Sequence, residues 1–191
     1  MAAPVRWIST TQEHPWRELD APELGELRAM PSVILQTDDP QQAIEGFGAS
    51  FNELGWTSLS HLTDEDRDAV MRELFEPGTG LNLTRCRMPV GANDFSTDWY
   101  SYDETPGDLS LDDFSIEHDR ATLVPFIQAA QRHQPDLTLW ASPWSPPTWM
   151  KTNGHYAAAK ASPLAAGVDN GIRDDQLGAE GTDMMRLDDD T

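Results

Sequence analysis

The residues best suited to chemistry gather in one proline-rich stretch, 141–154. Trp144 and Trp149 lie there among hydroxyls, a lysine and an amide, and three prolines fall within five residues, at 143, 146 and 147. Prolines remove backbone donors and fix φ, so regular structure must stop there. Flat indole faces beside polar groups are a common way to hold a sugar. The same tryptophans could instead pack a loop onto the core, and composition leaves both interpretations open.

Alternating strands and helices must position this stretch. A short apolar run predicts a buried strand at 138–142, directly before it. The other predicted elements are a strand at 43–47, a helix at 64–75, a strand at 83–88 and a helix at 117–132. The first helix has a cap at Thr63 and three acids after it, and Pro125 should kink or restart the second helix. The alternation predicts parallel strands joined by right-handed crossovers, an α/β fold.

Four ordered motifs resemble glycoside hydrolase family 30, the glucosylceramidase-like retaining β-glycosidases. They are IEGFGASF at 44–51, LTRCRMPVGANDFS at 83–96, YSYDETPGD at 100–108 and ASPWSPPTWMKTNG at 141–154. Ala49 replaces a usual Gly, and Asn93 replaces a common Cys. The resemblance covers 44–154, well over half of the chain, and four motifs in order make it specific.

The resemblance implies about three β/α units, the N-terminal part of a (β/α)8 TIM barrel, at 43–155. Residues 1–42 would then hold N-terminal strands of an accessory β-sandwich, at 5–9 and 32–36, and a linker. Without a sandwich partner we expect these strands to be poorly ordered or wrongly paired. Residues 156–191 carry many acids and few apolar anchors, which predicts a flexible loop after the third barrel strand.

No catalytic residue is expected within this chain. The family's acid/base glutamate follows the fourth barrel strand and its nucleophile follows the seventh. A whole barrel needs about 250 residues, this chain has 191, and no Asn-Glu-Pro triplet occurs in it. The resemblance therefore assigns the chemistry to a longer parent protein.

Substrate-binding residues are expected at the carboxyl ends of the strands. The resemblance implies that Asp94 accepts hydrogen bonds from sugar hydroxyls in the −1 subsite and that Trp144 lines the same subsite. It also implies that Arg87 lies beside the catalytic carboxylates and keeps the nucleophile ionised. Phe95 and Asn153 are weaker candidates at the rim. The alternatives are an Asn-Asp turn for Asp94, loop packing for Trp144 and a structural ion pair for Arg87.

Other reactive residues lack a functional pattern. Asp103, Glu104 and Asp108 fall in a turn-rich loop, where we expect them to be solvated. The five histidines show no metal-ligand spacing, and neither a metal nor a cofactor is expected. Cys86, inside an apolar strand, is expected to be a buried small hydrophobe.

Composition narrows the partners and the location. A net charge of −20 argues against nucleic acid and anionic membranes. No run reaches transmembrane length, and the start lacks the apolar core of a signal peptide, so a cytoplasmic location is expected.

The expected activity of the parent protein is hydrolysis of a β-glycosidic bond with retention, first of glucosylceramide-like β-glucosides. On its own the chain should be inactive. The alternatives are a truncated pseudoenzyme or sugar-binding remnant, and one half of a split β-1,6-glucanase, β-xylosidase or β-fucosidase whose complementing C-terminal half supplies both glutamates.

Overall fold

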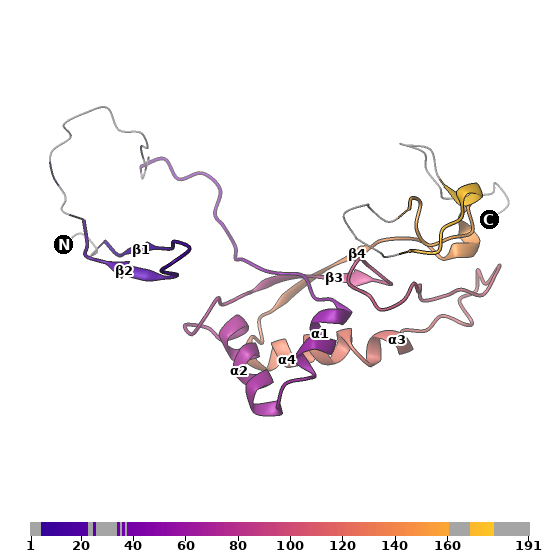
Figure 1. Ribbon diagram of the computed structural model, residues 1–191, viewed down its shortest axis with the longest axis horizontal. Coiled ribbons are helices and arrows are strands. Elements are labelled where there is room, and N and C mark those ends of the chain that lie inside the picture. The colour runs from indigo at the N-terminus through magenta and orange to yellow at the C-terminus, as the bar shows by residue number, and fades with distance from the viewer. Residues whose placement is uncertain are drawn as a thin grey trace. The chain divides into compact units, whose positions relative to one another are not determined.

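The structure is a computed structural model that describes residues 5–22, 25, 34, 36, 38–160 and 169–177 (Figure 1). Its contacts divide the chain into two units, Met1–Ala43 and Ile44–Thr191. The site lies in the second unit.

The first unit contains one two-stranded sheet. β1 (Trp7–Ser9) pairs antiparallel with β2 (Arg17–Leu19), and Arg6 forms an ion pair with Glu18 at 3.1 Å. The strand predicted at 5–9 is therefore present, and it pairs with β2, a strand that the sequence pattern did not predict. The strand expected at 32–36 lies largely outside the described residues.

Two parallel strands form the sheet of the second unit. β3 (Arg85–Val90) pairs with β4 (Thr138–Pro143) in a register that runs from Arg85 opposite Thr138 to Val90 opposite Pro143. The strands were predicted at 83–88 and 138–142, so type, order and direction are correct and the first is displaced by two residues. Among the described residues the sheet does not close into a barrel.

The segment before the first helix runs beside β3 but forms only a single isolated bridge, Ser50 with Arg87, so the strand predicted at 43–47 is not present as such. The N–H of Arg87 donates to the Ala49 carbonyl at 2.9 Å, and the N–H of Phe51 donates to the Arg87 carbonyl at 2.9 Å. A Cβ at Gly48 would lie 1.4 Å from the Arg85 carbonyl oxygen, so only glycine permits this approach.

The helices are α1 (Glu53–Leu59), α2 (Asp64–Phe75), α3 (Glu117–Arg120) and α4 (Leu123–His133), with short 3-10 helices η1 (Thr148–Met150) and η2 (Asp174–Gln176). The cap predicted for α2 is present, because the Thr63 hydroxyl accepts the Asp66 N–H at 3.1 Å. The helix predicted at 117–132 is divided at 121–122. Pro125 is the third residue of α4, where its missing N–H leaves no helical bond unmade.

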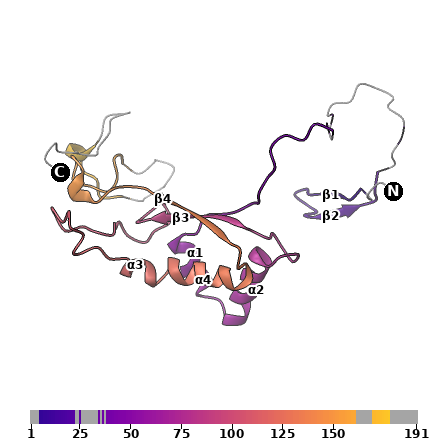
Figure 2. The same ribbon diagram turned by 180° about the vertical axis from the view of Figure 1, so that it is seen from behind.

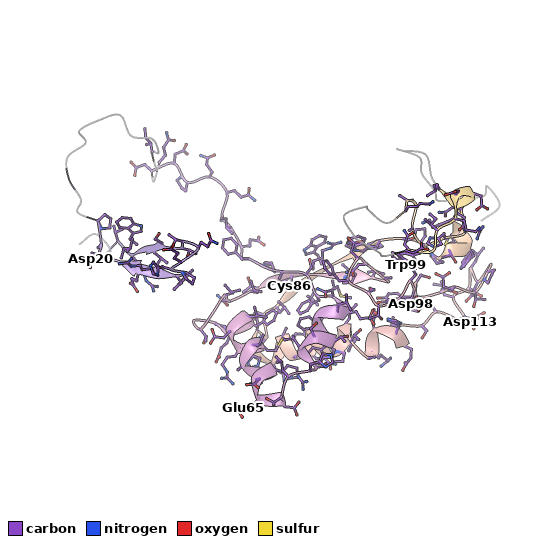
Figure 3. The ribbon with its side chains drawn as sticks, in the orientation of Figure 1. Asp20, Glu65, Cys86, Asp98, Trp99 and Asp113 are labelled. Atoms are coloured by element: carbon purple, nitrogen blue, oxygen red, sulfur yellow. The ribbon has the colours of Figure 1, made fainter. Side chains whose placement is uncertain are left out.

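The core lies between the sheet and the helices. Phe51 stacks on Phe75 at 5.9 Å and meets Phe126 edge-on at 4.8 Å between ring centroids. Cys86, 1% exposed, belongs to the same cluster, which confirms it as a buried hydrophobe (Figure 3). Burial raises the pKa of its thiol.

The helices α1, α2 and α4 all lie on one side of the sheet, as both views show (Figures 1 and 2). Because side chains alternate along a strand, Cys86 faces these helices and Arg87 faces the opposite side. Register places Trp140 and Ser142 on the same face as Arg87. No helix of the described ranges covers this helix-free face, and part of the site lies on it.

Candidate functional site

Both strands end at the same edge of the sheet, since Val90 and Pro143 are paired and each is the last residue of its strand. The chain leaves β3 through Gly91, whose φ of 75° is left-handed. The loop that carries Asp94 and the loop that carries Trp144 therefore start side by side. In parallel α/β folds this edge is where ligands bind.

Asp94 is exposed at the tip of a tight turn that Asn93 organises. The buried Asn93 side-chain oxygen accepts the Phe95 N–H at 2.8 Å, and the Asn93 N–H donates to the Ser96 hydroxyl at 3.0 Å. The Phe95 carbonyl in turn accepts the Leu54 N–H of α1 at 3.0 Å. No hydrogen bond reaches the Asp94 carboxylate from the described residues, so a rigid turn presents a free acceptor.

Arg87 lies between two indoles on the helix-free face. Its guanidinium carbon is 5.4 Å from the Trp140 ring and 5.1 Å from the Trp144 ring, both within cation–π range. One terminal nitrogen donates to the Ser142 hydroxyl at 3.1 Å. Its Nε is buried and meets no acceptor in the described part of the chain. A guanidinium that is fixed in place and has an unused N–H donor can bind a neighbouring carboxylate or other anion.

The structure brings Arg87 and Trp144 into contact, whereas the described contacts do not include Asp94 touching either. Trp144 is 43% exposed, so one part of its ring packs and another stays accessible. The roles of Asp94, Trp144 and Arg87 at a sugar subsite stay predictions.

The two rim candidates differ. Phe95 is 58% exposed beside Asp94. Asn153 instead uses its side-chain amide internally, donating to the Ala157 carbonyl at 2.8 Å and the Gln176 carbonyl at 3.2 Å. These bonds hold the loop that follows β4 against η2. The observed role of Asn153 is therefore structural.

The region after 155 includes buried anchors among its described residues. Tyr156 is 6% exposed and donates to the Ala92 carbonyl at 2.7 Å, and Ile172 is 5% exposed. Trp99 stacks on Tyr156 and donates to the Asn170 carbonyl at 3.2 Å. The loops that follow β3 and β4 are thereby joined.

A buried polar network connects the Asp94 loop to α1 and α3. The sequence patterns did not reveal this network. Glu53, 6% exposed, accepts from the Thr97 N–H at 3.0 Å and the Thr97 hydroxyl at 2.9 Å, and it contacts His118 Nε2 at 3.1 Å. Burial tends to raise the pKa of Glu53, but these hydrogen bonds outweigh it and lower the pKa below its usual value.

Asp119 extends this support. It is 3% exposed and accepts hydrogen bonds from the hydroxyls of Tyr100, at 2.6 Å, and Tyr102. Burial and the Asp119 carboxylate raise the pKa of both tyrosines well above the ordinary value, so both remain donors. The capping residue Asn52 could have indicated α1 from sequence. The contacts of Glu53 and Asp119 join residues far apart in the chain, and such contacts leave no local signal.

One expectation about the acidic loop is wrong. Asp103 is 6% exposed rather than solvated, and its Oδ1 accepts the Thr105 N–H at 3.0 Å. Glu104 accepts from the N–H and hydroxyl of Thr148, which joins the loop to η1. Asp108 accepts the Asp113 N–H at 2.8 Å, the first of several bonds that lower its pKa.

No group of three or more histidine, cysteine or carboxylate side chains that could hold a metal occurs within the described ranges. The described helices also include none long and apolar enough to cross a membrane.

Comparison with known proteins places these features in a family. Residues 44–170 match the Glycosyl hydrolase family 30 TIM-barrel domain. The chain is 34% identical over 124 residues to the lysosomal acid glucosylceramidase of Mus musculus, covering 64% of this chain and 24% of that protein. It is 34% identical over 116 residues to the endo-1,6-beta-D-glucanase of Neurospora crassa, covering 59% and 24%.

The chain also resembles a solved structure. SrfJ from Salmonella typhimurium superposes with a TM-score of 0.69 and 30% identity, over 82% of this chain and 35% of that one. The chain spans about a quarter of the length of the curated relatives it matches, 23% of the first. The family match extends over more than half of the chain. It includes every strand and helix of the second unit except η2, and the chain belongs to glycosyl hydrolase family 30.

Proposed function

We propose that this chain provides the sugar-binding edge of a retaining β-glycoside hydrolase that acts on glucosylceramide-like β-glucosides. The single observation that carries the proposal is the exposed Asp94 carboxylate, which a rigid turn presents at the carboxyl end of β3 without a donor from the described residues. An ionised carboxylate of this kind accepts strong hydrogen bonds from two sugar hydroxyls.

Each site residue has a distinct role in the proposal. Asp94 fixes the sugar in the −1 subsite, and the accessible part of the Trp144 indole covers an apolar sugar face. Arg87 is a positioning residue, whose cation favours an ionised carboxylate beside it. The acid/base and nucleophilic glutamates come from the parent protein outside residues 1–191, about 5 Å apart as retention requires.

A second substrate has specific support. The Neurospora crassa relative named as an endo-1,6-beta-D-glucanase is as identical to this chain as the mouse glucosylceramidase, 34% in both cases. The described part contains one edge of the sugar site only, so β-1,6-glucan stands as the alternative substrate of the same reaction.

The test begins with the coding sequence beyond residue 191. A continuation that contains Asn-Glu-Pro would be expressed whole and assayed on glucosylceramide and on β-1,6-glucan, with NMR to follow the anomer released first. The proposal expects hydrolysis of glucosylceramide with retention. Preferred hydrolysis of β-1,6-glucan would establish the alternative, and an inactive whole protein, or inversion, would contradict both.

A further inference from the structure

A cavity lies at the same edge of the sheet as the predicted sugar site, because Val90 and Pro143 at the strand ends line it. It has a volume of about 380 Å³ and is bounded by the ends of β3 and β4, the loop at 101–114 and η1. Asp94, Trp144 and Arg87 do not line it. Such a volume is in the range that holds a small organic molecule.

The walls of this cavity are mostly apolar. Leu109, Leu111 and Phe114 come from the loop after β3, and Pro146, Trp149 and Met150 come from the stretch after β4. The two loops are fastened to each other, because the Trp149 indole N–H donates to the Asp103 carbonyl at 3.1 Å. The cavity is thus formed by linked segments and favours an apolar body.

Two carboxylates contribute the charge. Asp103 lines the cavity while only 6% exposed, and its Oδ2 is buried without a hydrogen-bond donor from the described residues. Asp108 lines the same cavity, but its carboxylate already accepts from Ser110, Asp112 and Asp113, so it contributes charge rather than a free acceptor. Carboxylates only accept, so neither satisfies the other while both are ionised, and an unpaired buried carboxylate is costly.

The side-chain donors among the described lining residues are already engaged. The hydroxyls of Ser101 and Ser145 donate to the carbonyls of Asp103, at 3.3 Å, and Pro146, at 3.0 Å. The Tyr102 hydroxyl donates to Asp119, and the Trp149 indole donates as described above. The cavity therefore offers acceptors and apolar surface but no free side-chain donor.

We propose that this cavity binds an organic ammonium ion, a primary or secondary amine on an apolar body, whose N–H group donates to the unpartnered Oδ2 of Asp103, with the negative charge of Asp108 beside it. An ammonium group only donates, which matches a site that only accepts. Sugar hydroxyls must both donate and accept, so this cavity suits them less. A metal ion fits the cavity less well, since the described ranges contain no group of three or more histidine, cysteine or carboxylate side chains that could hold one.

The experiment uses the full chain and two probes of the same shape, phenethylammonium and the neutral 2-phenylethanol. Binding would be measured by calorimetry and by shifts in NMR spectra, on the wild type, on Asp103→Asn and on the control Asp113→Asn. Asp113 is an exposed acid of the same loop and does not line the cavity (Figure 3). Both substitutions change the net charge equally.

The expected result is a dissociation constant of about 1 mM or below for phenethylammonium, with at least about tenfold weaker binding of 2-phenylethanol. Asp103→Asn should weaken phenethylammonium at least about tenfold and leave 2-phenylethanol unchanged, which also shows that the cavity is intact. Asp113→Asn should change neither probe.

Three outcomes would overturn the proposal. They are no binding of phenethylammonium at about 10 mM, equal binding of the two probes, and equal binding of phenethylammonium to wild type and Asp103→Asn. The comparison of probes on the wild type decides the matter even if Asp103→Asn does not fold. The sugar-binding proposal is unaffected by any of these results.

Discussion

Among the acids that follow β3, Asp94 differs in what its carboxylate contacts. Asp98 accepts the Trp99 N–H at 2.8 Å, and Asp108 accepts two backbone N–H groups. Asp119 is saturated by two tyrosines. Asp94 alone among these four has no hydrogen bond within the described structure, so its acceptor capacity is left for a ligand.

Asp94→Ala in the whole protein should therefore reduce kcat/KM with little effect on folding. Two charge-assisted hydrogen bonds, each worth about 1.5–3 kcal/mol, should be lost, and they tighten as the sugar distorts toward the transition state. A loss of about 3–4 kcal/mol corresponds to a few hundredfold. Steady-state kinetics on the preferred β-glucoside measure it.

Asp113→Ala is the matched control, because Asp113 is exposed in the same long loop. Asp103 of the same loop is unsuitable as a control, because it is buried rather than solvated. The control should cost less than about tenfold. Similar losses in both variants, or a change in thermal stability alone for Asp94→Ala, would identify Asp94 as a turn residue.

The two indoles beside Arg87 permit a paired comparison. Trp140→Ala and Trp144→Ala each remove one cation–π contact, worth about 0.5–1 kcal/mol at such exposed positions. If Trp144 also covers a sugar face, its loss should reduce kcat/KM about two- to tenfold beyond the loss from Trp140→Ala, since aromatic stacking adds about 0.5–1.5 kcal/mol. Denaturant unfolding and kinetics on both variants separate the two effects, and equal kinetics would assign Trp144 to packing.

Side-chain alternation along a strand is local geometry, so the sequence alone is enough to place Arg87 on the face opposite Cys86. Local sequence was insufficient to predict the burial of Asp103, because the contact with Trp149 comes from 46 residues away. A turn-rich acidic loop resembles a solvated one until a distant segment covers it. The roles assigned to Asp94 and Trp144 came from the family motifs rather than from spacing.

At the scale of elements, α1 and α3 hold the loop of Asp94 in place through Glu53 and His118. The contacts span 44 and 65 residues of sequence, from Glu53 to Thr97 and from Glu53 to His118. The long helix α2 was predicted in full from its cap and its acidic first turn. The seven-residue α1 was missed because about two helical turns carry little periodic signal.

This support should make folding stability depend on pH. The pKa of Glu53 is lower in the folded chain than in the unfolded chain, so the unfolded state binds more protons as the pH falls. The stabilisation is present above the unfolded pKa near 4.5 and is lost as the pH falls through the lower folded value. Urea unfolding from pH 7 to pH 3 should show this loss.

Glu53→Gln tests the assignment. It should cost about 1–3 kcal/mol at pH 7, because a charged acceptor becomes neutral, and the loss of stability below about pH 4.5 should become shallower. Glu73→Gln, at an exposed position of α2 whose carboxylate has no hydrogen bond within the described residues, is the control and should keep the wild-type slope. An unchanged slope in Glu53→Gln would show that other groups set the pH dependence.

At the scale of the whole molecule, the two faces of the sheet differ sharply. One face packs on α1, α2 and α4, whereas the other carries Trp140, which is 59% exposed, and Arg87. In the described residues no strand pairs with the outer edge of β4. An exposed aromatic face beside an unpaired edge is a typical site of association.

The chain of residues 1–191 should therefore bind hydrophobic dyes and self-associate as its concentration rises. Trp140→Gln should lower both the fluorescence of bound anilinonaphthalene sulfonate and the average mass in sedimentation, because it removes a large, 59% exposed apolar side chain from that face. Trp7→Gln is the control, since Trp7 is 48% exposed but belongs to the first unit. A wild-type chain that stays monomeric and binds no dye would show that this face needs no cover, and equal effects of the two substitutions would place the association elsewhere.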